Sequence, residues 1–155
     1  MMIDELLNKI QGRFGQDILN LYKKNDKRAY IDIYPKDIVA MTRYLFKDLG
    51  LRFNIASAVD DFDGLEVLYH FSLDRSGVVV SVRVILKDKL NPAIDTITKV
   101  TRSAWWIERE MHELFGINFN DNEDLRPLLL SDDWPKGVYP MRKDFIAQKR
   151  DSRKV

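Results

Sequence analysis

The sequence of 155 residues contains no cysteine and only two histidines, His70 and His112. The absence of cysteine excludes disulfides, thiolate metal sites, iron–sulfur ligation and cysteine nucleophiles. No stretch approaches the roughly 20 apolar residues that span a bilayer, and the first segment lacks the apolar core of a signal peptide. We therefore expect any link to a membrane to run through another protein.

Strong charge of one sign is also lacking, since the formal net charge is +1. Such a balance gives no general attraction to nucleic acid or to an anionic membrane. Hydrophobic residues make up 45% and charged residues 32% of the chain, which is ordinary for a soluble globular domain. The length fits one domain, and a chain of this size buries roughly 70% of its unfolded surface.

The spacing of apolar residues predicts both helices and strands. Ile3, Leu6 and Ile10 share one face of a helix, whereas alternation over Val78–Leu86 is typical of a strand with one covered face. We expect helices at 2–14, 35–49 and 96–115. We expect a turn followed by a strand over 17–23, and further strands at 29–34, 51–59, 65–73 and 78–86.

This order of elements predicts an α+β fold, a two-layer domain with helices on one face of a mostly antiparallel sheet. The pattern disappears after Ile117, and the remaining chain reads as an extended C-terminal arm. We therefore divide the chain into an α+β domain at 1–117 and an extended, partner-wrapping arm of the same domain at 118–155.

The arm carries apolar residues on a chain with little periodicity. Leu125 to Leu130 form an apolar run that Pro127 interrupts, and Trp134 follows soon after. Leucines and aromatic residues held on loops usually need a second surface. We expect the arm to lie on a partner protein.

The segment from Trp106 to Phe145 resembles the core motif of the C subunit of the proton-pumping NADH–quinone oxidoreductase, complex I. The same family includes the equivalent subunit of membrane-bound, energy-converting nickel–iron hydrogenases. Its pattern of Glu-Arg-Glu, an acid three residues on and two apolar residues is matched here by Glu108-Arg109-Glu110, Glu113 and Leu114-Phe115. Arg126 and the run Arg142-Lys143-Asp144-Phe145 continue the likeness.

Two departures from the family pattern concern partner specificity. Asn122 occupies the position of a usual His or Lys, and Glu123 that of a usual proline. The usual Gly-His-Pro-Leu before the last motif reads Val-Tyr-Pro-Met over 138–141.

The resemblance implies a non-catalytic subunit without flavin, quinone, cluster or metal ligands. It implies packing against the large catalytic subunit, which is the D subunit or the hydrogenase large subunit, and contact with other peripheral-arm subunits. The location would be the cytoplasmic side of the cell membrane, reached only through the complex. The expected partner interface comprises Glu108, Arg109, Glu110, Glu113, Arg126, Asp133, Trp134, Arg142, Lys143, Asp144 and Phe145.

Other interpretations of single features remain open. Glu108 and His112 could form a metal pair, but zinc needs three or four ligands. The glutamates of this helix could act as acid–base groups, although no nucleophile or cofactor motif accompanies them.

We expect the acids at 60, 61 and 63 to form a solvated hairpin end. The basic tail from Arg142 to Val155 could bind nucleic acid or lipid, and a stand-alone enzyme or nucleic-acid-binding module is the rival class of function.

Overall fold

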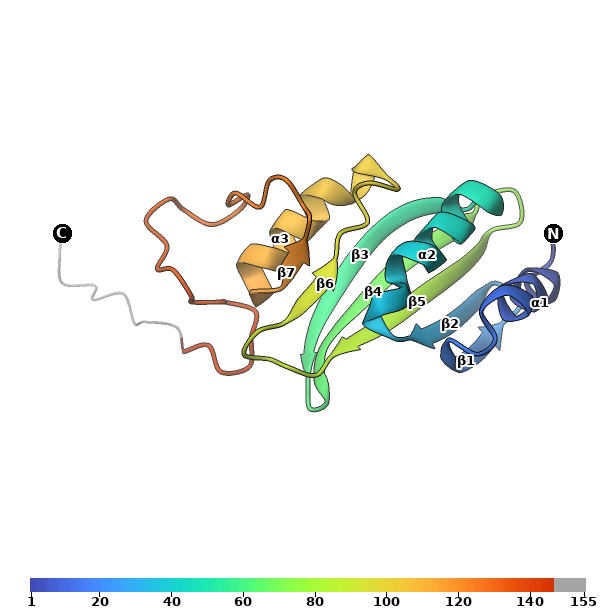
Figure 1. Cartoon of the computed structure of the whole chain (residues 1–155), viewed down its shortest axis with the longest axis horizontal. Helices are drawn as coiled ribbons and strands as arrows, with labels where there is room; N and C mark the ends of the chain where they lie inside the picture. The colour runs from blue at the N-terminus through green and yellow to red at the C-terminus, as the bar shows by residue number, and fades with distance from the viewer. Residues whose placement is uncertain (147–155) are drawn as a thin grey trace.

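A mixed sheet of five strands forms the centre of this computed structural model, which describes residues 1–146 (Figure 1). The strand order is β1-β2-β5-β4-β3, and only β2 and β5 run parallel. The expected mostly antiparallel α+β fold is therefore confirmed. The strands are β1 (Ile18–Asn25), β2 (Arg28–Ile33), β3 (Arg52–Asp61), β4 (Gly64–Leu73) and β5 (Val78–Leu86).

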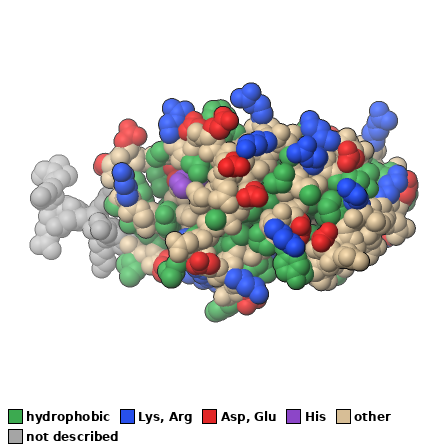
Figure 2. All heavy atoms as spheres, viewed as in Figure 1, with side chains coloured by type: hydrophobic (Ala, Val, Ile, Leu, Met, Phe, Trp, Pro, Cys, Tyr) green, Lys and Arg blue, Asp and Glu red, His purple; other side chains and the backbone are tan. Residues whose placement is uncertain are grey.

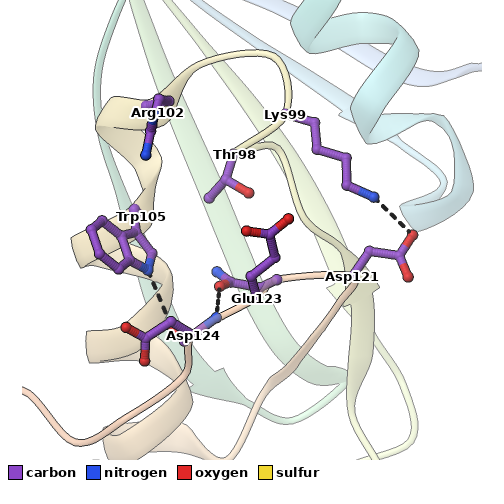
Figure 3. A pocket seen from close by; sticks show the side chains of 8 residues that line it. Thr98, Lys99, Arg102, Trp105, Asp121, Glu123 and Asp124 are labelled. Atoms are coloured by element: carbon purple, nitrogen blue, oxygen red, sulfur yellow. Dashed lines mark hydrogen bonds and ion pairs between the residues drawn. The ribbon is translucent and has the colours of Figure 1, made fainter.

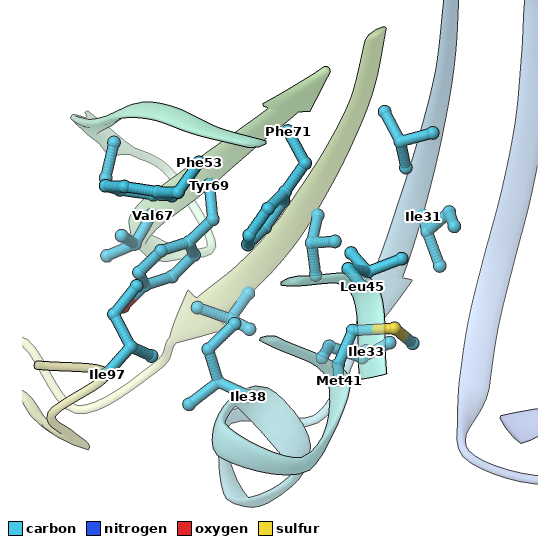
Figure 4. Packing of buried hydrophobic residues seen from close by; sticks show 14 of the residues in the cluster. Ile31, Ile33, Ile38, Met41, Leu45, Phe53, Val67, Tyr69, Phe71 and Ile97 are labelled. Atoms are coloured by element: carbon cyan, nitrogen blue, oxygen red, sulfur yellow. The ribbon is translucent and has the colours of Figure 1, made fainter. Parts of the chain in front are cut away.

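The α-helices lie on one face of this sheet, as predicted (Figure 1). They are α1 (Ile3–Phe14), α2 (Ile38–Arg43) and α3 (Trp105–Phe115). Tyr69 and Phe71 of β4 are fully buried against Ile38 and Met41 of α2 (Figure 4). Burial of each such side chain contributes about 1.5–3 kcal/mol, so this layer is the main source of stability.

The opposite face of the sheet is mixed, as its sequence pattern predicts. Arg83 on β5 donates to Asp32 at 2.7 and 2.8 Å and to Glu66 at 3.3 Å, which links three neighbouring strands. His70 lies between the hydroxyls of Ser57 and Ser81. Both ring nitrogens of His70 therefore have partners within the sheet.

The helix expected from 96 to 115 begins later than its spacing indicates. Ile97 and Val100 are buried, but they lie in a loop that follows a short strand, β6 (Ala93–Asp95). The backbone N–H of Thr96 donates to the carbonyl of Asn120 at 3.0 Å, which fixes this loop beside β7 (Asn118–Asn120). Apolar residues at helical spacing here enter the core from a loop. A 3-10 turn, η3 (Arg102–Ala104), then leads into α3.

Two further boundaries differ from those expected. The second helix is divided into a 3-10 turn, η1 (Pro35–Asp37), α2 and a π-helical turn, η2 (Tyr44–Asp48). Residues 118–120 form β7, which pairs with β6, so the body continues three residues past the expected start of the arm. We use the name arm for residues 121–146, and the rest of the expected basic tail, 147–155, lies outside the described residues.

Gly116 ends α3 and lets the arm return across it. Its φ of +73° is a left-handed conformation that suits glycine at a helix end. A Cβ at this position would lie 2.5 Å from the ring of Tyr139, so the absence of a side chain also allows the arm to approach. Within residues 1–146, no helix has the length and apolarity needed to cross a bilayer.

Candidate partner interface

The arm has no core of its own. From Asp121 to Ile146 no side chain is buried, although Phe119, immediately before the arm, is 1% exposed. Leu129, Met141 and Ile146 are 62%, 56% and 86% exposed. Hydrophobic burial within this chain therefore does little to hold the arm in place.

Helix α3 holds the first half of the arm through hydrogen bonds to its backbone. Arg109 donates to the carbonyl oxygens of Arg126 and Pro127, at 2.8 Å each. The carboxylate of Glu113 accepts from the backbone N–H groups of Leu128 at 2.9 Å, Leu129 at 2.6 Å and, more weakly, Leu130 at 3.3 Å. Two charged side chains thus satisfy the backbone of a segment that has no regular partner strand.

The second half of the arm is attached near the end of the sheet. Arg142 donates to the carbonyl oxygens of Phe115 at 2.7 Å and Lys89 at 2.8 Å. The backbone N–H of Lys143 donates to Asp60 at 2.8 Å. The arm is therefore a loop fixed at both ends.

Asp60 was expected in a solvated hairpin end, and that expectation is wrong for this residue. Asp60 is 8% exposed and accepts from the Lys89 ammonium group at 2.5 Å. Burial tends to raise the pKa of Asp60, but the bonds from Lys89 and Lys143 outweigh it and hold the pKa below its ordinary value. Lys143 lies 83 residues away, which local sequence patterns do not reveal.

Glu108 joins helix α3, the loop after β6 and the start of the arm. Its side chain is fully buried and accepts from Thr96 Oγ1 at 2.6 Å, the N–H of Ile97 at 2.9 Å and Asn122 Nδ2 at 2.7 Å. Burial raises the pKa of this carboxyl above its ordinary value, although the three bonds act in the opposite direction. The bonding partners of Glu108 are thus neutral groups of its own chain, and its side chain has no surface exposed to solvent.

A hollow of about 440 Å³ opens beside this cluster, between the loop after β6 and the start of the arm (Figure 3). Lys99 pairs with Asp121 across it at 3.3 Å, and Glu123 projects into it. Trp105 forms one wall and donates its indole N–H to the carbonyl of Asp124 at 3.1 Å. Arg126 donates to the Asp124 carboxylate and lowers its pKa to about 2.

Lys99 and Arg126 pair with the carboxylates of Asp121 and Asp124, and the hollow contains no arrangement typical of a nucleophile with its base. Across residues 1–146, no group of three or more His, Cys, Asp and Glu side chains is placed to hold a metal ion. His112 instead lies 2.8 Å from the carbonyl of Ile117, through Nδ1.

The expected interface residues therefore fall into two groups. Those that bond the arm to the body are Glu108, Arg109, Glu113, Arg142 and Lys143. Those that leave side-chain surface open to solvent are Glu110, Arg126, Asp133, Trp134, Asp144 and Phe145. The side chain of Lys143 is also 55% exposed, and the contact of any of these residues with a partner stays a prediction.

The surface around these residues is mixed in charge. On the side seen in Figure 2, acidic and basic side chains alternate, with apolar side chains exposed between them. Trp106 on α3 adds to the apolar surface, since it is 63% exposed. A surface of this kind differs from the basic patch or stripe that is typical of nucleic-acid sites.

Comparison with known proteins identifies a family. Residues 31–151 match the family model described as respiratory-chain NADH dehydrogenase, 30 Kd subunit. The C subunit of the NADH-quinone oxidoreductase of Trichlorobacter lovleyi is 32% identical over 153 residues, which cover 92% of this chain and 88% of that protein. The C subunit of the F(420)H(2) dehydrogenase of Methanosarcina mazei is 39% identical over 83 residues, or 54% of this chain and 51% of the relative.

A fused relative and two solved structures extend the comparison. The fused C/D subunit of the NADH-quinone oxidoreductase of Rhodopseudomonas palustris is 29% identical, with 93% of this chain and 26% of that protein covered. A chain of the membrane-bound sulfane sulfur reductase, an archaeal respiratory membrane complex, has a TM-score of 0.81 at 22% identity, covering 97% of this chain and 96% of that one. A trypsin-resistant fragment of Nqo5 has a TM-score of 0.63 at 19% identity, covering 77% and 98%. At these identities the two structures show the fold alone.

The buried carboxyl of Glu108 predicts a pH effect on stability. The pKa of Glu108 is raised in the folded state. As pH rises through 4.5, this carboxyl therefore loses its proton in the unfolded chain before it does so in the folded one. The free energy of unfolding should then fall until the folded-state pKa is passed, and level off above it. Glu108→Gln removes this titration. Urea unfolding from pH 4 to 8 should show the wild type losing stability relative to the variant. Parallel curves would contradict the prediction, and Glu110→Gln is the control.

Loss of the Glu113 carboxylate should release the middle of the arm. In Glu113→Ala, the amides of Leu128 and Leu129 lose their acceptor, and an unmade bond of this kind costs about 1–3 kcal/mol. Hydrogen exchange at these amides should accelerate about tenfold or more, while the β4 and β5 amides keep their rates. Glu110→Ala, on the same helix, should change neither set. Unchanged exchange in Glu113→Ala would show that other contacts hold the arm.

Proposed function

The chain belongs to the family of the respiratory-chain NADH dehydrogenase 30 Kd subunit, and from this membership we propose that it is a non-catalytic structural subunit of a quinone-reducing respiratory complex. In this proposal it packs against the large catalytic subunit, the D subunit, in the peripheral part of the complex. The electron donor is bound by other subunits. The complex would hold the chain at the cytoplasmic side of the membrane.

The exposure of the arm is the observation that carries this proposal. A stretch of 26 residues, from 121 to 146, follows the surface without one buried side chain. It contains Leu129, Trp134 and Phe145, residue types that stabilise interfaces when a partner covers them. The arm is nevertheless fixed to the body at both ends, so its shape exists before binding and association costs less conformational entropy.

The fused relative supports the choice of partner. A protein named as a combined C/D subunit carries in one chain a part similar to this one. Fusion of two subunits keeps them at a high effective concentration, which suits parts that bind each other. The D subunit is therefore the partner that we propose for the arm, with other peripheral-arm subunits as further neighbours.

The names of the relatives favour a dehydrogenase over a hydrogenase. The curated relatives described above belong to NADH-quinone oxidoreductase and to F(420)H(2) dehydrogenase. These two names differ in the electron donor, which fits a subunit whose role does not involve the donor. The complex of this chain is accordingly proposed as a quinone reductase of this general type.

The exposed charges near the arm predict an assembly defect without unfolding. Arg126 is 77% exposed and pairs with Asp124 at 2.6 Å, and such an exposed pair contributes only about 0–1 kcal/mol to stability. Arg126→Ala and Glu110→Ala should leave the thermal unfolding of the isolated chain nearly unchanged. When the complex is purified, retention of the large subunit should fall about tenfold or more, because an interface charge that loses its partner is costly.

Arg75→Ala, in the turn between β4 and β5, is the matched control and should keep the large subunit. Unfolding of the free chain by either test substitution would assign the residue an internal role. Purification of the wild type from its own cells without any large redox subunit would contradict the proposed function itself.

A further inference from the structure

The second half of the arm encloses an open hollow of about 810 Å³. Trp134, Val138 and Phe145 contribute its apolar surface. The rings of Trp134 and Phe145 lie 6.1 Å apart at an angle of 33°. This hollow lies outside the polar cluster around Glu108, and nothing else in the described chain fills it.

Hydrogen bonds fix the shape of this hollow. The indole N–H of Trp134 donates to the carbonyl of Val138 at 2.8 Å, which closes the turn between them. The N–H groups of Arg142 and Phe145 donate to the carbonyls of Tyr139 at 3.2 Å and Arg142 at 3.1 Å. A preformed apolar site loses little entropy when it binds a ligand.

The rim of the hollow is acidic. Asp133 and Asp144 line it, and within residues 1–146 neither forms an ion pair. Arg142 also lines it, but its N–H groups bind two backbone carbonyls and its guanidinium lies 4.7 Å from the centre of the Tyr139 ring. The rim therefore carries two carboxylates and one guanidinium, which leaves it with a net negative charge.

We propose that this hollow receives an apolar segment of the large partner subunit that carries an arginine or a lysine. The apolar side chain would cover Trp134 and Phe145. The cation would bond Asp133 or Asp144, and an arginine could also stack on the indole, where attraction to the ring adds to the ion pair. The inference rests on the proposed function and adds to it the chemistry of the bound segment.

A segment of this chain is the competing occupant. Residues 147–155 follow directly on Ile146, which lines the hollow, and they include Lys149, Arg150, Arg153 and Lys154. The same acidic rim would attract these residues. The experiment must therefore separate a link within the chain from a link to the partner.

Photo-crosslinking in the complex purified from native cells makes this separation. Benzoylphenylalanine replaces Ile146, which is 86% exposed, so the fold should tolerate the change. The same probe at Tyr22, which is 56% exposed on β1, is the control. Mass spectrometry of the linked peptide should identify a large-subunit segment with a basic residue next to apolar ones, absent from the control. A link to residues 147–155, to an acidic segment or to none would overturn the inference.

Charge reversal gives a second and independent test. The double variant Asp133→Lys with Asp144→Lys should lower retention of the large subunit about tenfold or more, because like charges then meet across the interface. Asp48→Lys, at an exposed site at the end of η2, should retain it. Changing the linked basic residue of the partner to Glu should restore retention with the double variant. Failure to restore it would contradict the proposed pairing.

The outcomes distinguish this inference from the proposed function. If the large subunit is retained by the wild type but is neither linked from Ile146 nor lost on charge reversal, only the hollow's role is wrong. If the purified wild-type chain carries no large subunit, both the proposed function and this inference are wrong.

Discussion

An irregular chain must bond its backbone N–H and carbonyl groups, and helix α3 meets this requirement for the arm. Arg109 donates to two carbonyls of the arm, and Glu113, of opposite charge, accepts from its N–H groups. Both side chains project from one helix whose buried residues fix it against the sheet. The arm therefore takes a defined path although its contribution to the core is small, with Leu125 only partly buried against it.

In this arrangement, different side chains hold the arm in place and remain available to bind a partner. The side chains of α3 contact the backbone of the arm, so the arm's own side chains remain available. Trp134, Phe145 and Leu129 keep apolar surface that a neighbouring protein can cover. Residues of the Glu-Arg-Glu motif of α3 and the acid that follows it thus hold the arm in place. We propose that the exposed side chains of the arm contact the partner.

The sequence predicted what depends on local periodicity and missed what depends on distant contacts. The helix at 2–14 and the strands at 65–73 and 78–86 follow from the spacing of apolar residues and agree with the structure to within one residue. The late start of α3 was missed because Ile97 and Val100 are buried from a loop.

The roles of single charges were the least predictable feature. Glu108 was expected at the interface, yet its neutral donors come from residues 96, 97 and 122, which the fold brings together. Asn122, which stands where the family usually has a His or Lys, is one of these neutral donors. The backbone N–H of Lys143 binds Asp60 across 83 residues, and contact of its side chain with a partner stays a prediction. Spacing in the sequence cannot show such pairs.

Hydrogen exchange of the arm, compared between the free chain and the native complex, tests most directly whether a larger neighbour covers it. Residues 131–146 should exchange more slowly in the complex than in the free chain, while β4 and β5 remain equally protected in both. Equal exchange of residues 131–146 in the two states would mean that no other protein covers the arm and would contradict the account.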